Sequence, residues 1–98
     1  MDQKETAACK AAALIELRKI YSGNSTKIQC VRLHEALKLF PVNTHEARLY
    51  LDLYWPPARI LQLRQSGLKI ITRWLSVVTE AGVKHRVGQY VLLPGGAR

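Results

Sequence analysis

Residues 44–67 have the sequence THEARLYLDLYWPPARILQLRQSG, in which two short helical patterns flank a pair of prolines. Thr44 is a suitable N-cap for the first pattern, so we expect a helix over residues 45–53. Two consecutive prolines cannot lie inside a helix, whereas a proline suits the first helical position. A second helix is therefore expected over residues 57–66, and Gly67 is placed to stop it.

Two more helices are expected before this stretch. Residues 3–21 are rich in Ala, Leu, Glu, Lys and Arg, which are strong helix formers. Ser25 or Thr26 is suited to cap the helix that follows. This helix should run to about Leu39, because Pro41 prevents its continuation.

The pattern changes after Gly67, where β-branched and aromatic residues replace the helix formers. Residues 68–78 and 83–93 are each typical of a strand, and the turn residues 80–82 separate them. We therefore expect a two-stranded hairpin after the last helix.

This order of elements predicts a mainly α domain with a β-hairpin, arranged as a winged helix-turn-helix. Three core helices and a two-stranded wing would form residues 25–94. Residues 1–24 would form an extra N-terminal helix and linker, and residues 95–98 a tail. In such a fold the helix over residues 57–66 is the recognition helix, which enters the major groove of DNA.

The charge distribution also favours a nucleic acid as the partner. The chain has 98 residues and a net charge of +8. Residues 56–90 hold a single acid, Glu80, against six cations: Arg59, Arg64, Lys69, Arg73, Lys84 and Arg86. Such an excess of cations is typical of surfaces that contact phosphates. The expected partner is double-stranded DNA.

One face of the predicted recognition helix carries residues suited to reading bases. Ile60 and Leu63 share the side expected to face the core. Pointing outward are Ala58, Arg59, Gln62, Gln65 and Ser66. Arginine pairs with guanine and glutamine with adenine in the major groove, and a small alanine allows close approach. An ordinary solvated helix face is the alternative.

The remaining candidate contacts lie outside this helix face. One is Thr44, a further DNA-binding candidate. The others are four cations on or beside the hairpin, and these cations would contact phosphates: Lys69, Arg73, Lys84 and Arg86. Each cation is equally compatible with a simple solvated side chain. Arg64 is expected either to contact DNA or to bond an acid such as Glu46 or Asp52. Trp55, Trp74 and Tyr90 are expected to pack in or near the core.

Other classes of function have little support in the sequence. There is no glycine-rich phosphate loop and no nucleophile motif, so we expect neither an enzyme nor a cofactor. Cys9, Cys30 and the three histidines lack the spacing of a metal site. No apolar run approaches the length of a membrane span, so a cytoplasmic protein is expected. The alternative function is a winged-helix module that docks proteins without binding DNA.

The N-terminal helix carries an apolar stripe formed by Leu14, Leu17 and Tyr21, with Ala7 and Ala11 behind it. A lone helix of this length is marginal in water, so the stripe must pack against something. Self-association into a homodimer is the favoured expectation. Docking onto the following helix of the same chain competes with it.

Four motifs in residues 28–93 resemble a family of small helix-turn-helix domains found largely in phage and prophage proteins. They are T-x-E-A at residues 44–47, P-x-A-R-I-x-x-L-R-x-x-G at 56–67, I-x-T at 70–72 and H-R-V-x-x-Y-V-L at 85–92. The resemblance implies a winged-helix DNA-binding module, acting as a transcriptional regulator or an excision-type architectural factor. An acid often precedes the Leu-Arg pair in this family, whereas this chain has Gln62 there.

Overall fold

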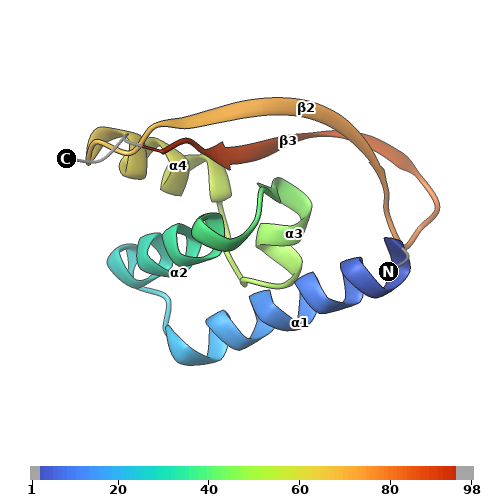
Figure 1. Cartoon of the computed structure of the whole chain (residues 1–98), viewed down its shortest axis with the longest axis horizontal. Coiled ribbons are helices and arrows are strands. Elements are labelled where there is room, and N and C mark those ends of the chain that lie inside the picture. The colour runs from blue at the N-terminus through green and yellow to red at the C-terminus, as the bar shows by residue number, and fades with distance from the viewer. Residues whose placement is uncertain (1–2, 95–98) are drawn as a thin grey trace.

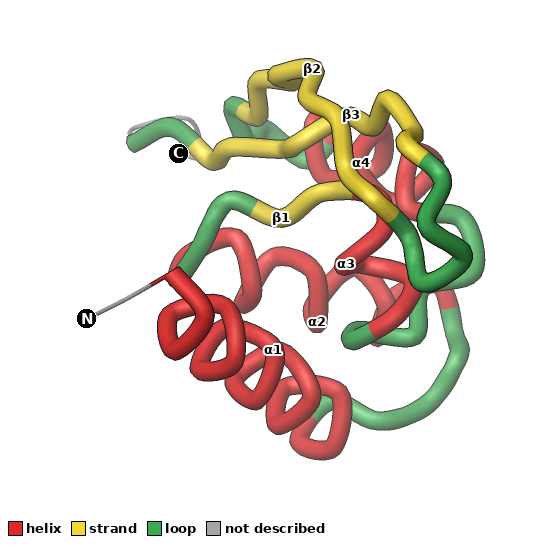
Figure 2. The backbone as a smooth tube through the Cα atoms, turned by 90° about the vertical axis from the view of Figure 1, so that its right-hand side faces the viewer, coloured by secondary structure: helices red, strands yellow, loops and turns green. Residues whose placement is uncertain are grey.

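The computed structural model describes residues 3–94, so the expected tail and the first two residues lie outside the described range. Within this range there are four helices and three strands (Figure 1). In chain order they are α1 (Gln3–Ile20), α2 (Thr26–Leu39), β1 (Val42–Asn43), α3 (Thr44–Leu49), α4 (Pro56–Gln65), β2 (Ile70–Val78) and β3 (Lys84–Leu92). The sheet lies on one side of the helices, and α1 lies on the opposite side from the hairpin in both views (Figure 2).

Local capping explains most helix boundaries. The Ser25 hydroxyl accepts a hydrogen bond from the Ile28 amide at 3.2 Å and so caps α2. Helix α4 begins at Pro56, one residue before the expected start, with both prolines in its first turn. Gly67 follows this helix with a φ of 108°, a conformation that glycine adopts without strain.

Helix α3 differs from its prediction at both ends. Its N-cap is Asn43, not Thr44, because the Asn43 side chain and Glu46 form a reciprocal capping box. The helix ends at Leu49, four residues before the expected end. The chain leaves the helix toward Asp52, whose φ of 54° is left-handed. The connection to α4 therefore spans residues 50–55 and is longer than the helical pattern predicted.

The sheet has a third strand that the sequence did not predict. Strand β1 pairs antiparallel with β3, with Val42 opposite Tyr90 and Asn43 opposite Gln89. The strand order is β1-β3-β2. A strand is predicted from the alternation of polar and apolar residues, and β1, with two residues, is too short to show it. Its partner in the sheet also lies far along the chain. Within residues 3–94, no strand pairs with residues 84–88 of β3 on this edge.

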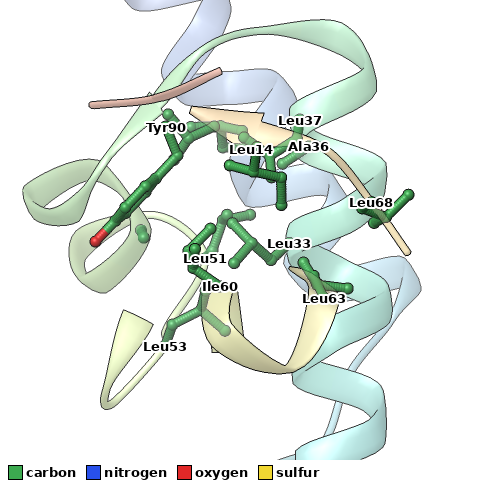
Figure 3. Close-up of a cluster of buried hydrophobic side chains, with 13 residues drawn as sticks. Leu14, Leu33, Ala36, Leu37, Leu51, Leu53, Ile60, Leu63, Leu68 and Tyr90 are labelled. Carbon is green, nitrogen blue, oxygen red and sulfur yellow. The ribbon is translucent and has the colours of Figure 1, made fainter. Parts of the chain in front are cut away.

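One hydrophobic core joins all four helices to the sheet (Figure 3). Its buried members are Leu14, Leu33, Ala36, Leu37, Val42, Ala47, Leu51, Leu53, Ile60, Leu63, Leu68, Ile70 and Tyr90. Tyr90 is 7% exposed, in agreement with its expected packing role. None of the described helices is both long and apolar enough to cross a membrane.

Helix α1 packs within its own chain, where it contacts α2 as the competing expectation of docking onto the following helix predicted. Leu14 is fully buried in the core, and Leu17 packs partly buried against it. The ammonium of Lys10 also lies 3.0 Å from the carboxylate of Glu46 on α3. The stripe therefore already has a partner in the same molecule, and the homodimer stays a prediction.

A buried arginine fixes two loops beside this helix. Arg32 of α2 is 1% exposed and donates to the carbonyls of Tyr21 at 2.7 Å and Gly23 at 3.0 Å. It also donates to the carbonyl of Asp52 at 3.4 Å. Burial lowers the pKa of Arg32, and nearby Asp52 partly offsets this. The α1–α2 loop and the α3–α4 turn are thus held by one side chain.

Candidate nucleic-acid interface

Two of the predicted base-reading residues on α4, Arg59 and Gln62, are half-buried and contact α2. Arg59 Nη1 lies 3.5 Å from the side-chain oxygen of Gln29, and Arg59 Nε is buried without a partner. The Cys30 thiol donates to the side-chain amide oxygen (Oε1) of Gln62 at 3.4 Å. Burial raises the pKa of this thiol, partly offset by Arg59, so the protonated donor form is favoured. Helix α2 packs against this side of α4, which makes Arg59 and Gln62 interhelical contacts.

The solvent-facing side of α4 consists of other residues. Pro57, Leu61 and Gln65 recur every four residues and are exposed, Leu61 by 56%. Ala58 lies half-buried beside them. The exposed position of Gln65 agrees with the prediction, whereas Leu61 was missed because an apolar residue in a helix is assigned to the core by default. The described residues of α4 include no acid.

Ser66 is exposed but has a capping role at the end of α4. Its hydroxyl donates to the Leu63 carbonyl at 2.7 Å, and its amide bonds carbonyls of the last helical turn. A hydrogen-bonded hydroxyl at this place stabilises the helix terminus. Ser66 therefore lies at the edge of the face that α4 presents.

Arg64 connects α4 to the wing. Its Nε donates to the Ile70 carbonyl at 2.9 Å, and its Nη2 donates to the Thr72 hydroxyl at 3.0 Å. Neither of the two expected acids is its partner, since Glu46 binds Lys10 and the Asn43 amide. A carboxylate was one expected partner of Arg64, whereas in the structure the guanidinium donates to the main-chain carbonyl of Ile70 in β2.

The hairpin separates its cations between two faces. Side chains directly opposite each other in a ladder share a face. Ser76 pairs with Arg86 and Val78 with Lys84, which places both cations on the face of Trp74 and Tyr90. Arg73 lies on the other face, and Lys69 precedes β2. All four cations are exposed, but they do not form one patch.

Thr44 ties the start of α3 to the centre of the sheet. Its hydroxyl lies 3.3 Å from the Gly88 carbonyl and 3.4 Å from the Tyr90 hydroxyl. The side chain is half-buried. Thr44 thus positions α3 against β3, and its contact with DNA stays a prediction.

A groove of about 510 Å³ lies between α3, the first turn of α4 and the wing. Its lining includes Thr44, His45, Arg48, Pro57, Trp74, Thr79, His85, Arg86 and Tyr90. The Arg86 guanidinium lies 5.0 Å from the centre of the Trp74 ring. Trp74 is 63% exposed, which corrects its assignment to packing.

A second exposed indole lies beside Arg48, outside the lining of this groove. Trp55 is 55% exposed, although it was expected in the core, and the Arg48 guanidinium lies 5.5 Å from its ring centre. The two prolines that follow hold Trp55 at the N-cap of α4, outside the helix. At the wing tip, His45 Nε2 is 3.7 Å from a Glu80 oxygen. Among residues 3–94 no cluster of three or more potential metal ligands is present.

One of three comparisons with known proteins supports this architecture. No curated protein and no solved structure matches the chain significantly. Residues 28–94 match the family model described as "Winged helix-turn-helix domain". This match covers more than half of the chain and includes α3, α4 and both strands of the wing. The chain belongs to the winged helix-turn-helix domain family.

Proposed function

We propose that this protein binds double-stranded DNA, with α4 in the major groove and the wing along the backbone. The observation that carries the proposal is the acid-free exposed side of α4, which Arg64 joins to β2. In a winged helix-turn-helix the helix after the turn reads bases. Since the helix and the hairpin are bonded to each other, they would meet the duplex as one unit.

The residues exposed on α4 suit A·T base pairs better than G·C base pairs. The guanine contact expected from Arg59 is therefore not part of the proposal. Gln65 has the donor and acceptor that match adenine N7 and N6. Leu61 offers an apolar surface for the methyl group of thymine, and Ala58 allows close approach. Arg59 and Gln62 would support the helix through α2 without touching bases.

Phosphate contacts would come from the exposed cations beside this helix. Lys84 and Arg86 lie on one face of the wing, and Lys69 lies between α4 and β2. Such contacts release counterions, so binding should weaken steeply as salt increases.

The proposed role is binding without catalysis, as a transcriptional regulator or an excision-type architectural factor of a phage or prophage. The support for this role is the resemblance of residues 28–93 to such domains. The protein would then act in the cytoplasm, where the DNA of its host is located.

Fluorescence anisotropy on mixed-sequence and A·T-rich duplexes over a salt series tests the proposal. We expect log affinity to fall linearly with log salt. Absence of duplex binding at about 50 mM salt, where phosphate contacts are strong, would contradict it.

A protein-docking module is the second candidate, because Leu61 and Tyr54 are exposed by 56% and 90%. Gln65→Glu separates the two functions. A new carboxylate on the exposed side of α4 should repel DNA strongly, whereas Gln65→Ala should lose only one base contact. Duplex binding that is unchanged in both variants would contradict base reading by α4 and favour the docking function.

A further inference from the structure

Two exposed indoles are each paired with an arginine, and one of them, Trp74, lines the groove between α3, α4 and the wing. Arg86 lies over Trp74, and Arg48 lies over Trp55. Both arginines line the groove between α3 and the wing. Aromatic faces alternating with cations are the pattern by which proteins hold unpaired bases and their phosphates.

The Trp74 indole lies beside its strand partner Gly88. Trp74 lies opposite Gly88 in the ladder. A Cβ atom at Gly88 would lie 3.7 Å from the indole and 3.1 Å from the Thr72 methyl group. Glycine at this position therefore lets the indole lie close to β3, while most of its surface faces the groove and solvent.

The charge of the groove fits a polyanion. Its described lining includes two arginines and two histidines but no carboxylate. Glu80 lies near the rim, 3.7 Å from His45. The volume of about 510 Å³ falls within the usual range for a small-molecule site, which is enough for a nucleotide.

We propose that this groove binds unpaired nucleotides of single-stranded DNA, with a base stacked on Trp74 and phosphates beside Arg86 and Arg48. Bases inside a duplex have both faces covered by their neighbours, so they cannot stack on an indole. An unpaired strand at a duplex end or a fork exposes these faces. This proposal depends on the proposed duplex binding in one respect only, because the bound duplex would supply the unpaired strand.

Tailed and blunt duplexes test this inference on the full chain. The probes are a blunt duplex, the same duplex with a short oligo(dT) tail, and oligo(dT) alone. We expect the tail to raise affinity at least about fivefold, as stacking of one base provides. In a Trp55→Phe background, oligo(dT) should also quench the fluorescence of Trp74.

Two substitutions at one exposed position provide the matched comparison. Trp74→Leu keeps apolar bulk but removes the aromatic face, so the ratio of tailed to blunt affinity should fall to about one. Trp74→Phe keeps a face for stacking and should retain most of the gain. A tail that gives no gain, or an equal loss for both probes in Trp74→Leu, overturns the inference while duplex binding stands. Oligo(dT) quenching without blunt-duplex binding supports the inference and contradicts the proposed function.

Discussion

Arg64 Nε donates a hydrogen bond of 2.9 Å to the main-chain carbonyl of Ile70, so the helix that would read DNA is bonded to the first residue of the wing. The same guanidinium reaches the Thr72 hydroxyl at 3.0 Å. A planar group with several fixed donors suits this double contact better than a lysine ammonium does. Arg64 therefore helps to fix the relative orientation of α4 and β2, together with the core packing of Leu63 and Ile70.

Arg64→Ala should uncouple the wing from α4. We expect the free energy of unfolding to fall by about 1 kcal/mol, as is usual for the loss of an intramolecular hydrogen bond. Amides near Thr72 should exchange with solvent faster, which hydrogen-exchange NMR measures. Lys69→Ala, which removes an exposed cation nearby, is the control. Equal exchange in both variants would refute the coupling.

Arg59 and Gln65 should respond to substitution in opposite ways. Arg59 contacts Gln29 between α2 and α4, so Arg59→Ala should lower stability and leave base preference unchanged. Gln65 is exposed, so Gln65→Ala should leave stability within about 0.5 kcal/mol. It should also relax preference at one base pair by about 1–3 kcal/mol. Thermal unfolding and binding to a panel of single-base variants measure the two effects, and relaxed preference in Arg59→Ala would contradict this division.

The sequence predicted the elements of the hairpin and α4 well because their limits depend on local chemistry. Pro56, Gly67 and Gly82 each mark a turn or helix end through their own backbone preferences, and the latter two have positive φ. Strand β1 was missed because it exists only through pairing with the distant Tyr90.

The site was predicted less well than the fold because the surroundings of its side chains are set by elements distant in the sequence. A helical wheel places Arg59 and Gln62 away from the core of α4, but it cannot show that α2 covers that side. Trp74 and Trp55 were assigned to the core because large aromatics usually are buried. Trp74 lines a groove formed by elements distant in the sequence, and Trp55 lies at the N-cap of α4 beside Arg48 of α3.

Replacing Lys84 and Arg86 together with alanine should weaken binding to all duplexes about equally. If both contact phosphate, the slope of log affinity against log salt should flatten by up to about two units. Arg73→Ala is the control, because Arg73 lies on the opposite face of the hairpin. A double variant with an unchanged slope would mean that this face of the wing does not meet the backbone.

Acid should destabilise the fold in part through His34. Burial lowers the pKa of His34, Lys38 lowers it further, and Glu35 opposes both. The unfolded chain then binds the proton more readily than the folded chain. This contribution to stability is therefore complete well above the ordinary histidine pKa of about 6.5 and is lost as pH falls through it. Denaturant unfolding at about pH 7.5 and 5.5 should show a smaller difference in His34→Gln than in the unsubstituted protein. An undiminished difference would exclude His34 as a contributor.

Leu14→Ala tests whether α1 is part of the domain core. Leu14 is fully buried within the cluster that joins α1 to the other helices and the sheet. Truncating a buried leucine typically costs about 2–5 kcal/mol, a large part of the total stability of a small domain. If α1 instead served to join two copies, the substitution would change the oligomeric state and leave the unfolding of each chain nearly unaffected. We therefore expect a large decrease in the midpoint of thermal unfolding, with no change of mass in sedimentation equilibrium. Ala12→Ser on the exposed side of α1 is the matched control, and it should alter neither measurement.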